Sequence, residues 1–214
     1  MKPDAYLPRG TVYGTLMNFQ REHALWASRM HEAPYLSPAR APVLYIKTAN
    51  TFAHSGQAIV LPAGVAEVEV AASLGLVAGD SGAIADAVLF NDVAIPHDSY
   101  YRPPVKFRCV DGFLGVGEVV KPFGDLLPIA SLVMELRVNG VMRQRTALAD
   151  LVRDAATLWA DVNAFQSLRA GDVLMVGTDC LEDGTRPRVR AGDAVEITAT
   201  GFAPLVNSFA EDTP

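Results

Sequence analysis

Most of this chain is divided into short apolar runs of strand length, separated by residues that favour turns. The sharpest turn signal is the pair Asn139-Gly140, because a two-residue hairpin turn needs positive φ at both positions. Glycine-aspartate pairs at 171–172 and 192–193 precede two further runs. We therefore expect a hairpin over 132–145 and strands over 11–19, 43–47, 58–62, 65–77, 173–178, 194–201 and 204–209.

Helical spacing is rarer along the chain. Apolar residues recur at three- and four-residue intervals from Leu148 to Phe165, which predicts a helix that Thr146 caps. Residues 20–33 form a second candidate helix, and 83–95 is expected to begin as a helix and end as a strand. Many strands with one clear helix favour an α+β, β-rich domain built around a mixed sandwich, roll or barrel-like sheet.

No repeat or low-complexity linker divides the 214 residues. We therefore expect a single domain over 1–214. Within it, 1–42 is predicted to form an N-terminal extension or lid segment, and 43–210 the catalytic β-roll. Three prolines at positions 34, 38 and 42 predict an irregular, extended path at the end of that extension, because proline lacks the donor that helices and ladders need.

Composition narrows the class of protein and of partner. Half of the residues are hydrophobic and 20% are charged, as in globular proteins. The net charge of −6, without a lysine- or arginine-rich run, argues against a nucleic-acid surface. No apolar stretch approaches the ~20 residues that span a bilayer, and the N-terminus lacks the apolar core of a signal peptide. We therefore expect a cytoplasmic protein that contacts no membrane, with Cys109 and Cys180 as reduced thiols.

Two glutamates interrupt the apolar run GVAEVEVAAS. Because side chains alternate along a strand, Glu67 and Glu69 point to the same face, roughly 7 Å apart, with Val68 and Val70 on the other face. Taken alone, this pattern favours a charged strand face in solvent. Two like charges on one face repel, however, unless water, an arginine or a cation lies between them. Asp92 follows another apolar run, and three carboxylates without histidine or cysteine suit Mg²⁺, Mn²⁺ or Ca²⁺.

The order of several motifs along the chain resembles the fumarylacetoacetate hydrolase family. These motifs are E-x-E, N-D-V, K-x-R-x-x-D-G-F, V-G-T, R-x-G-D and a closing L-V-N, and the block SYYRPPVKFRCVDGF is the most specific part. The resemblance covers residues 10–209. It implies a mixed β-roll whose metal, Mg²⁺ or Mn²⁺ (or Ca²⁺ in a crystal), is held by Glu67, Glu69 and Asp92.

The resemblance also implies a chemistry. Family members act on short oxygenated acids, in which a metal chelates the 1-carboxylate and the adjacent oxygen and stabilises an enolate. We therefore expect a divalent-metal-dependent isomerase/decarboxylase subunit that takes small keto or enol di- or tricarboxylates. Its substrates would be intermediates of homoprotocatechuate (4-hydroxyphenylacetate) breakdown, of the 2-hydroxy-dienedioate or 5-oxopent-3-ene-1,2,5-tricarboxylate type. The alternatives are a metal-dependent hydrolase of acylpyruvate-like diketo acids and a non-catalytic partner subunit of the same fold.

Remote substrate carboxylates would need cationic partners. Arg102, Lys106 and Arg108 in YYRPPVKFR are the candidates, because a guanidinium can donate two parallel bonds to a carboxylate. The family usually has lysine at the position of Arg108. Thr178 in V-G-T matches a threonine that meets the substrate carboxylate. An ordinary surface or structural role stays open for each of these residues.

Three residues are candidates for proton transfer. Lys47 matches a lysine that recurs in the family after the corresponding strand. Hydrolytic relatives carry a histidine four residues after an asparagine, whereas here Glu22 occupies that position and His23 follows it. On a helix that slip turns a side chain by about 100°, so the sequence leaves open whether Glu22 or His23 reaches the site. Bifunctional members contain two such halves, so a single half implies a homodimer or a heteromer with a sister subunit.

Overall fold

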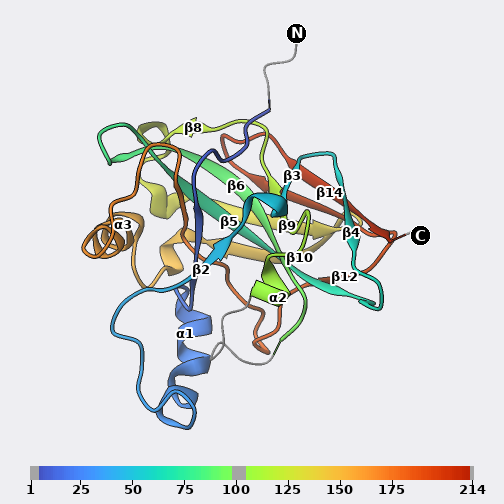
Figure 1. The fold of residues 1–214 in the computed structure, drawn as a ribbon, viewed down its shortest axis with the longest axis horizontal. Helices are drawn as coiled ribbons and strands as arrows, with labels where there is room; N and C mark the ends of the chain where they lie inside the picture. Colours follow the sequence, from blue (N-terminus) through green and yellow to red (C-terminus); the bar gives the residue numbers. More distant parts are fainter. Residues whose placement is uncertain (1–4, 98–104, 213–214) are drawn as a thin grey trace.

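The computed structural model describes residues 5–97 and 105–212, which form two β-sheets with few helices around them (Figure 1). The described helices are α1 (Gln20–Ala27), α2 (Val105–Arg108) and α3 (Ala155–Asn163). Within this part of the chain, no helix is long and apolar enough to cross a membrane.

The larger sheet contains nine strands and the smaller one five. The main path of the larger sheet is β2 (Val43–Lys47), β1 (Val12–Leu16), β11 (Val173–Met175), β5 (Val68–Ala78), β6 (Ile84–Ala94), β7 (Leu114–Val116) and β3 (Phe52–His54). Beside this path, β12 (Arg188–Val189) pairs with β5 and β8 (Lys121–Pro122) pairs with β6. The smaller sheet runs β10 (Val141–Ala147), β9 (Val133–Val138), β13 (Ala194–Ala199), β14 (Leu205–Glu211) and β4 (Ala58–Leu61).

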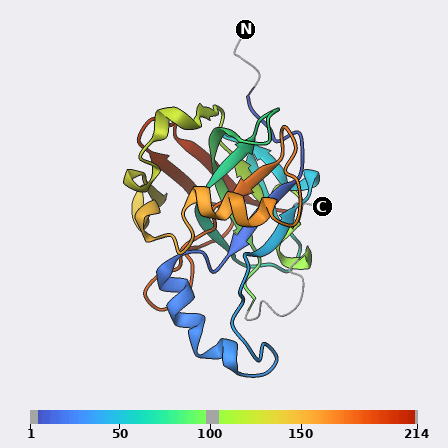
Figure 2. The ribbon, with the colours of Figure 1, turned by 90° about the vertical axis from the view of Figure 1, so that its left-hand side faces the viewer.

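Both sheets are mixed, which confirms the predicted β-rich α+β fold. The pairs β1–β11, β3–β7 and β14–β4 are parallel, and the other pairs are antiparallel. Figure 2 shows that α3 lies against the outside of the sheets, whereas α1 projects below them. The helices are therefore peripheral, and the two sheets form the body of the protein.

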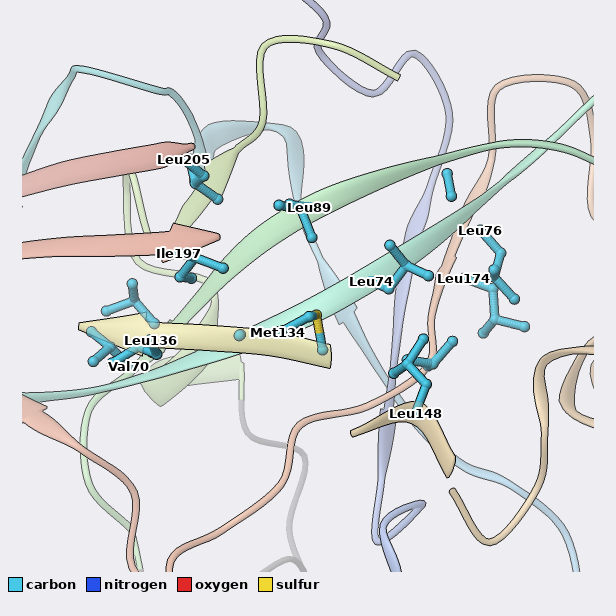
Figure 3. Packing of buried hydrophobic residues seen from close by; sticks show 14 of the residues in the cluster. Val70, Leu74, Leu76, Leu89, Met134, Leu136, Leu148, Leu174, Ile197 and Leu205 are labelled. Carbon is cyan, nitrogen blue, oxygen red and sulfur yellow. The ribbon is translucent and has the colours of Figure 1, made fainter. Parts of the chain in front are cut away.

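One apolar core lies between the two sheets (Figure 3). Leu74 of β5 and Leu89 of β6 belong to the same buried cluster as Met134 of β9, and each of these side chains is at most 1% exposed. Burying such a side chain contributes about 1.5–3 kcal/mol. The even-numbered residues of β5, including Val68 and Val70, point into this core. Its odd-numbered residues therefore face the other way, which fixes the face that carries Glu69.

The hairpin of β5 and β6 is the longest in the protein's described part, with eleven residues in each strand. The prediction that 83–95 begins as a helix is wrong, because β6 is a strand from Ile84 to Ala94. Residues 87–90 are all buried, on both faces of the strand. A strand buried on both faces reads as a continuous apolar run, which periodicity alone does not distinguish from a buried helix.

The hairpin at Asn139-Gly140 is confirmed, with φ of 51° and 76° at the two turn residues. The helix predicted from Thr146 onward begins later, at Ala155. Thr146 belongs to β10, and Asp154 is the N-cap, because its side chain accepts a hydrogen bond from the Thr157 amide at 2.8 Å.

The predicted boundary at residue 42 falls between two strands of one sheet. Within the predicted extension 1–42, β1 pairs with β2 on one side and with β11 on the other. The segment before 43 is therefore partly built into the roll. α1 and the irregular stretch after it project from the body (Figure 2), and a lid role for them stays a prediction.

Candidate active site

A cavity of about 280 Å³ opens at the Glu69 end of β5, between α1 and the loop that leads into β12. The charged side chains that line it are Arg29, Arg108, Arg186, Arg188, Glu69 and Asp183. Guanidinium groups have several N–H donors in a planar arrangement that matches a carboxylate. Four of them around one small cavity make it a candidate site for a multiply charged organic acid.

Asp92 lies behind the cavity wall in a buried cluster with Lys47, Arg108 and Tyr45, which we call the Asp92 cluster. Lys47 Nζ lies 2.7 Å from Asp92 Oδ1, and Arg108 Nη1 donates to Oδ2 at 2.9 Å. The Tyr45 hydroxyl donates to the same oxygen. Burial alone would raise the pKa of Asp92, but Lys47 and Arg108 hold that pKa below its usual value. The carboxylate therefore stays charged, with cations at both oxygens.

Lys47 was predicted as a catalytic residue, but the structure buries its ammonium away from the cavity. Besides pairing with Asp92, Nζ donates to the carbonyl oxygens of Val93, Arg108 and Phe113 at 2.7–2.8 Å. Burial lowers the pKa of Lys47, and the neighbouring Asp92 opposes that shift. The ammonium thus joins three chain segments, and this geometry indicates a structural role.

The orientation of α1 places Glu22 and His23 in different surroundings. Glu22 is buried, and one of its oxygens accepts from the Met17 amide at 3.0 Å while the other pairs with Arg186 Nη2 at 2.6 Å. Arg186 also donates to Thr178 Oγ1 at 3.0 Å. Glu22 and Thr178 therefore orient an arginine that lines the cavity. His23 is exposed and lies beside a separate small apolar cavity.

The strand register confirms that two of the predicted metal ligands share a face. Glu69 lies opposite Ala94 and Asp92 lies opposite Ala71, so Glu69 and Asp92 are diagonal neighbours on β5 and β6. The side chains nevertheless do not converge. Within 5–97 and 105–212, no three histidine, cysteine, aspartate or glutamate side chains are grouped as a metal ion would need.

Arg188 lies beside two of the predicted metal ligands, Glu67 and Glu69. It lies opposite Glu69 in the β12–β5 ladder, with Nη1 2.6 Å from Glu67 Oε1 and Nη2 3.8 Å from Glu69 Oε1. Burial raises the pKa of Glu69, while Arg186 and Arg188 oppose that shift. Because Glu67, Glu69 and Asp92 all face cations of the chain itself, the expected ligand set does not fit Mg²⁺, Mn²⁺ or Ca²⁺ as it is arranged here.

The other predicted substrate-binding residues have different locations. Arg108 lines the cavity, and its guanidinium carbon lies 4.6 Å from the centre of the Tyr45 ring. Lys106 is exposed, with Nζ 5.9 Å from the centre of the Phe107 ring, and it does not line the cavity. Arg102 lies outside the described residues. Of the two that the structure describes, Arg108 is the one placed where substrate could contact it.

Three cavity arginines were not predicted from the sequence: Arg29, Arg186 and Arg188. A signal for two of them exists in the stretch RPRVR, where Arg186 and Arg188 have the same two-residue spacing as Glu67 and Glu69. Strand spacing places such arginines on one face. Arg29 follows α1 and has no comparable signal.

Known proteins of similar sequence and structure identify the family of this chain. A family model described as the fumarylacetoacetate (FAA) hydrolase C-terminal domain matches residues 11–210. The 4-hydroxyphenylacetate degradation bifunctional isomerase/decarboxylase of Escherichia coli is 31% identical over 95% of this chain and 48% of its own length. This chain therefore spans about half of that relative.

Two solved structures share the fold at low sequence identity. The 5-carboxymethyl-2-hydroxymuconate delta-isomerase of Mycobacterium smegmatis has a TM-score of 0.78 and 23% identity, covering 99% of this chain and 82% of that one. The fumarylpyruvate hydrolase of Pseudomonas aeruginosa, in complex with Mn²⁺ and pyruvate, has a TM-score of 0.77 and 18% identity, covering 99% and 94%. A divalent metal is therefore present in a protein of the same fold.

Proposed function

The chain belongs to the fumarylacetoacetate hydrolase family, and on that premise we propose that it is an isomerase/decarboxylase of small keto or enol di- or tricarboxylates. The substrates would be of the 2-hydroxy-dienedioate type, as expected for intermediates of 4-hydroxyphenylacetate breakdown. One observation carries the proposal: four arginines surround a small cavity whose wall also bears Glu69.

The arginines suit recognition of two separate carboxylates. Arg108 forms an ion pair with the buried Asp92, and Arg186 forms one with the buried Glu22. A guanidinium oriented in this way loses little rotamer freedom when it donates to a ligand. Arg29, in the turn that follows α1, lines the same cavity. A substrate with a carboxylate at each end could therefore contact more than one of these guanidinium groups at once.

Glu69 is the residue we propose for proton transfer. It lines the cavity, its side chain is 13% exposed, and the guanidinium of Arg188 lies 3.8 Å from its carboxylate rather than in tight contact. Burial raises the pKa of Glu69, which brings a carboxylate closer to the range useful for general acid–base catalysis. Its carboxylate would take a proton from a carbon next to the carbonyl and return it at another position of the conjugated system.

The same arrangement serves isomerisation and decarboxylation. Loss of a proton and loss of CO₂ both leave an electron pair that moves onto the 2-oxygen, where guanidinium donors stabilise the developing negative charge. In isomerisation Glu69 would return to carbon the proton that it removed. In decarboxylation it would deliver to carbon a proton that it had first taken up from solvent. The hydrolase alternative has less support, because it needs an activated water and His23 lies outside the cavity.

The proposed function includes a second subunit of the same fold. Because the chain spans about half of its bifunctional relative, we propose that it works as a homodimer or with a sister subunit of the same fold. A non-catalytic role beside an active sister chain is the remaining alternative. Activity of the purified chain alone would contradict that alternative.

The direct test is the ketonisation of a 2-hydroxy-2,4-dienedioate by the purified chain. The conjugated dienol absorbs in the near ultraviolet, so its loss can be followed continuously against a protein-free control. We expect decay proportional to protein concentration. Decay at the buffer rate, with the isolated chain and at substrate concentrations up to the millimolar range, would contradict catalysis by this chain alone and favour the non-catalytic alternative.

Arg29→Ala should weaken substrate binding without altering the chemical step. Arg29 lines the cavity, and its guanidinium carbon lies 5.2 Å from the centre of the Trp26 ring. Losing a charge-assisted contact of about 1.5–3 kcal/mol predicts an increase of roughly 10- to 100-fold in KM, with kcat nearly unchanged. Steady-state kinetics with the dienol measure both values. An equal fall in kcat would instead place Arg29 in the chemical step.

A further inference from the structure

The E-x-E pair of this chain already has a cation beside it. Arg188 Nη1 lies 2.6 Å from a Glu67 oxygen, and Nη2 of the same guanidinium lies 3.8 Å from a Glu69 oxygen. The contact spans 121 residues of sequence and is set by the pairing of Arg188 opposite Glu69. One planar cation therefore bridges two carboxylates that would otherwise repel each other.

The neighbouring carboxylates Asp92 and Glu22 are also paired with cationic side chains of the chain. Four carboxylates near this cavity form ion pairs, Glu22, Glu67, Glu69 and Asp92, and the cations in contact with them are Lys47, Arg108, Arg186 and Arg188. The charge of the carboxylates is thus balanced by side chains of the chain itself. An added divalent cation would bring two positive charges into a balanced cluster.

We propose that Arg188 is a built-in cation that occupies the space a divalent metal would need between Glu67 and Glu69. The site then keeps its carboxylates in place without a bound metal. The side chains of Glu67 and Arg188 are 48% and 44% exposed, so ions in solution can reach them. Removal of the guanidinium leaves two like charges on one strand face, open to solvent and suited to a hard cation.

The role of Arg188 beside Glu67 and Glu69 is independent of the reaction that the cavity catalyses. A metal titration needs no substrate, so its outcome does not depend on whether the chain ketonises a dienol. Failure of the enzyme assay would leave this inference standing, and metal binding by the wild type would leave the proposed reaction standing.

The test is a calorimetric titration of metal-stripped protein with Mn²⁺ alone. Arg188→Ala removes the cation, and Arg188→Lys keeps a positive charge at the same position. Arg190→Ala is the matched control, because Arg190 is exposed and lies next to a different cavity. Circular dichroism establishes that each variant is folded, and Arg188→Gln replaces the alanine variant if that one does not fold.

We expect saturable binding of one Mn²⁺ per chain by Arg188→Ala, at least about tenfold tighter than by the wild type, because a positive charge within about 4 Å of the site is gone. The lysine variant and Arg190→Ala should resemble the wild type. Adding Glu69→Gln to Arg188→Ala should abolish the gain. Stoichiometric binding by the wild type that Glu69→Gln removes would overturn the inference, as would a folded Arg188→Ala protein without increased affinity.

Discussion

Replacing Asp92 by asparagine is expected to lower the free energy of unfolding by about 3–5 kcal/mol, the cost of removing one partner from a buried ion pair. The substitution leaves Lys47 and Arg108 close together without the anion that faces them both. The side chains of Lys47 and Arg108 are 0% and 2% exposed, so water has little access to the position of the lost carboxylate. Urea unfolding followed by circular dichroism measures the difference, provided that both proteins unfold in two states.

Asp161→Asn is the matched control for that experiment. Asp161 also pairs with an arginine, Arg153, at 2.9 Å, but its side chain is 41% exposed. Exposed pairs of this kind contribute about 0–1 kcal/mol. A similar small loss for both variants would contradict the view that the Asp92 cluster is a buried, charged unit of the fold.

The second large effect is expected at Glu69. Glu69→Gln keeps the size of the side chain but removes its capacity to accept a proton, so kcat for dienol ketonisation should fall by about 10²–10⁴-fold. The arginines that hold the substrate are untouched, so the dissociation constant of a non-reacting dicarboxylate should change little. Initial rates at saturating dienol and a binding titration separate the two quantities.

Asp183→Asn is the matched control, because it tests whether removing a different carboxylate from the cavity lowers kcat as much as Glu69→Gln does. Asp183 also lines the cavity, but its Oδ1 accepts from the amide and hydroxyl of Thr185 at 2.9 and 2.7 Å, as in a turn. We expect a less than about threefold change in kcat for this variant, since its carboxylate is assigned no proton transfer. Equal losses at Asp183 and Glu69 would remove the special role of Glu69.

The sequence was most informative where a local pattern decides the structure. Alternation in β5 placed Val68 and Val70 in the core and Glu69 on the opposite face, and the Asn139-Gly140 turn closed the expected hairpin. The helix after 146 was predicted too long for a physical reason. Leu148 and Leu151 are buried core residues, but they lie before the cap at Asp154, in a 3₁₀ turn and the strand-like link that follows it.

The electrostatics of the site depend on contacts that no local pattern contains. Glu22 and Arg186 are separated by 164 residues, and Glu67 and Arg188 by 121. Spacing predicted that the carboxylates share a face, yet it could not show which cations the fold would bring to them. Glu69 and Asp92 lie on neighbouring strands of the sheet and Glu67 directly precedes β5, while the cations that face them became visible only in the structure.

Deuterium exchange would show whether this cavity transfers protons to and from the carbon beside a carbonyl. The wild-type chain, treated with a chelator, would be mixed with a saturated 2-oxo-dicarboxylate in D₂O, and the protons next to the carbonyl followed by nuclear magnetic resonance. We expect the resonance of the protons next to the carbonyl to disappear at a rate proportional to protein concentration. With Glu69→Gln the loss should be far slower. Exchange no faster than in buffer alone would contradict proton transfer by this cavity.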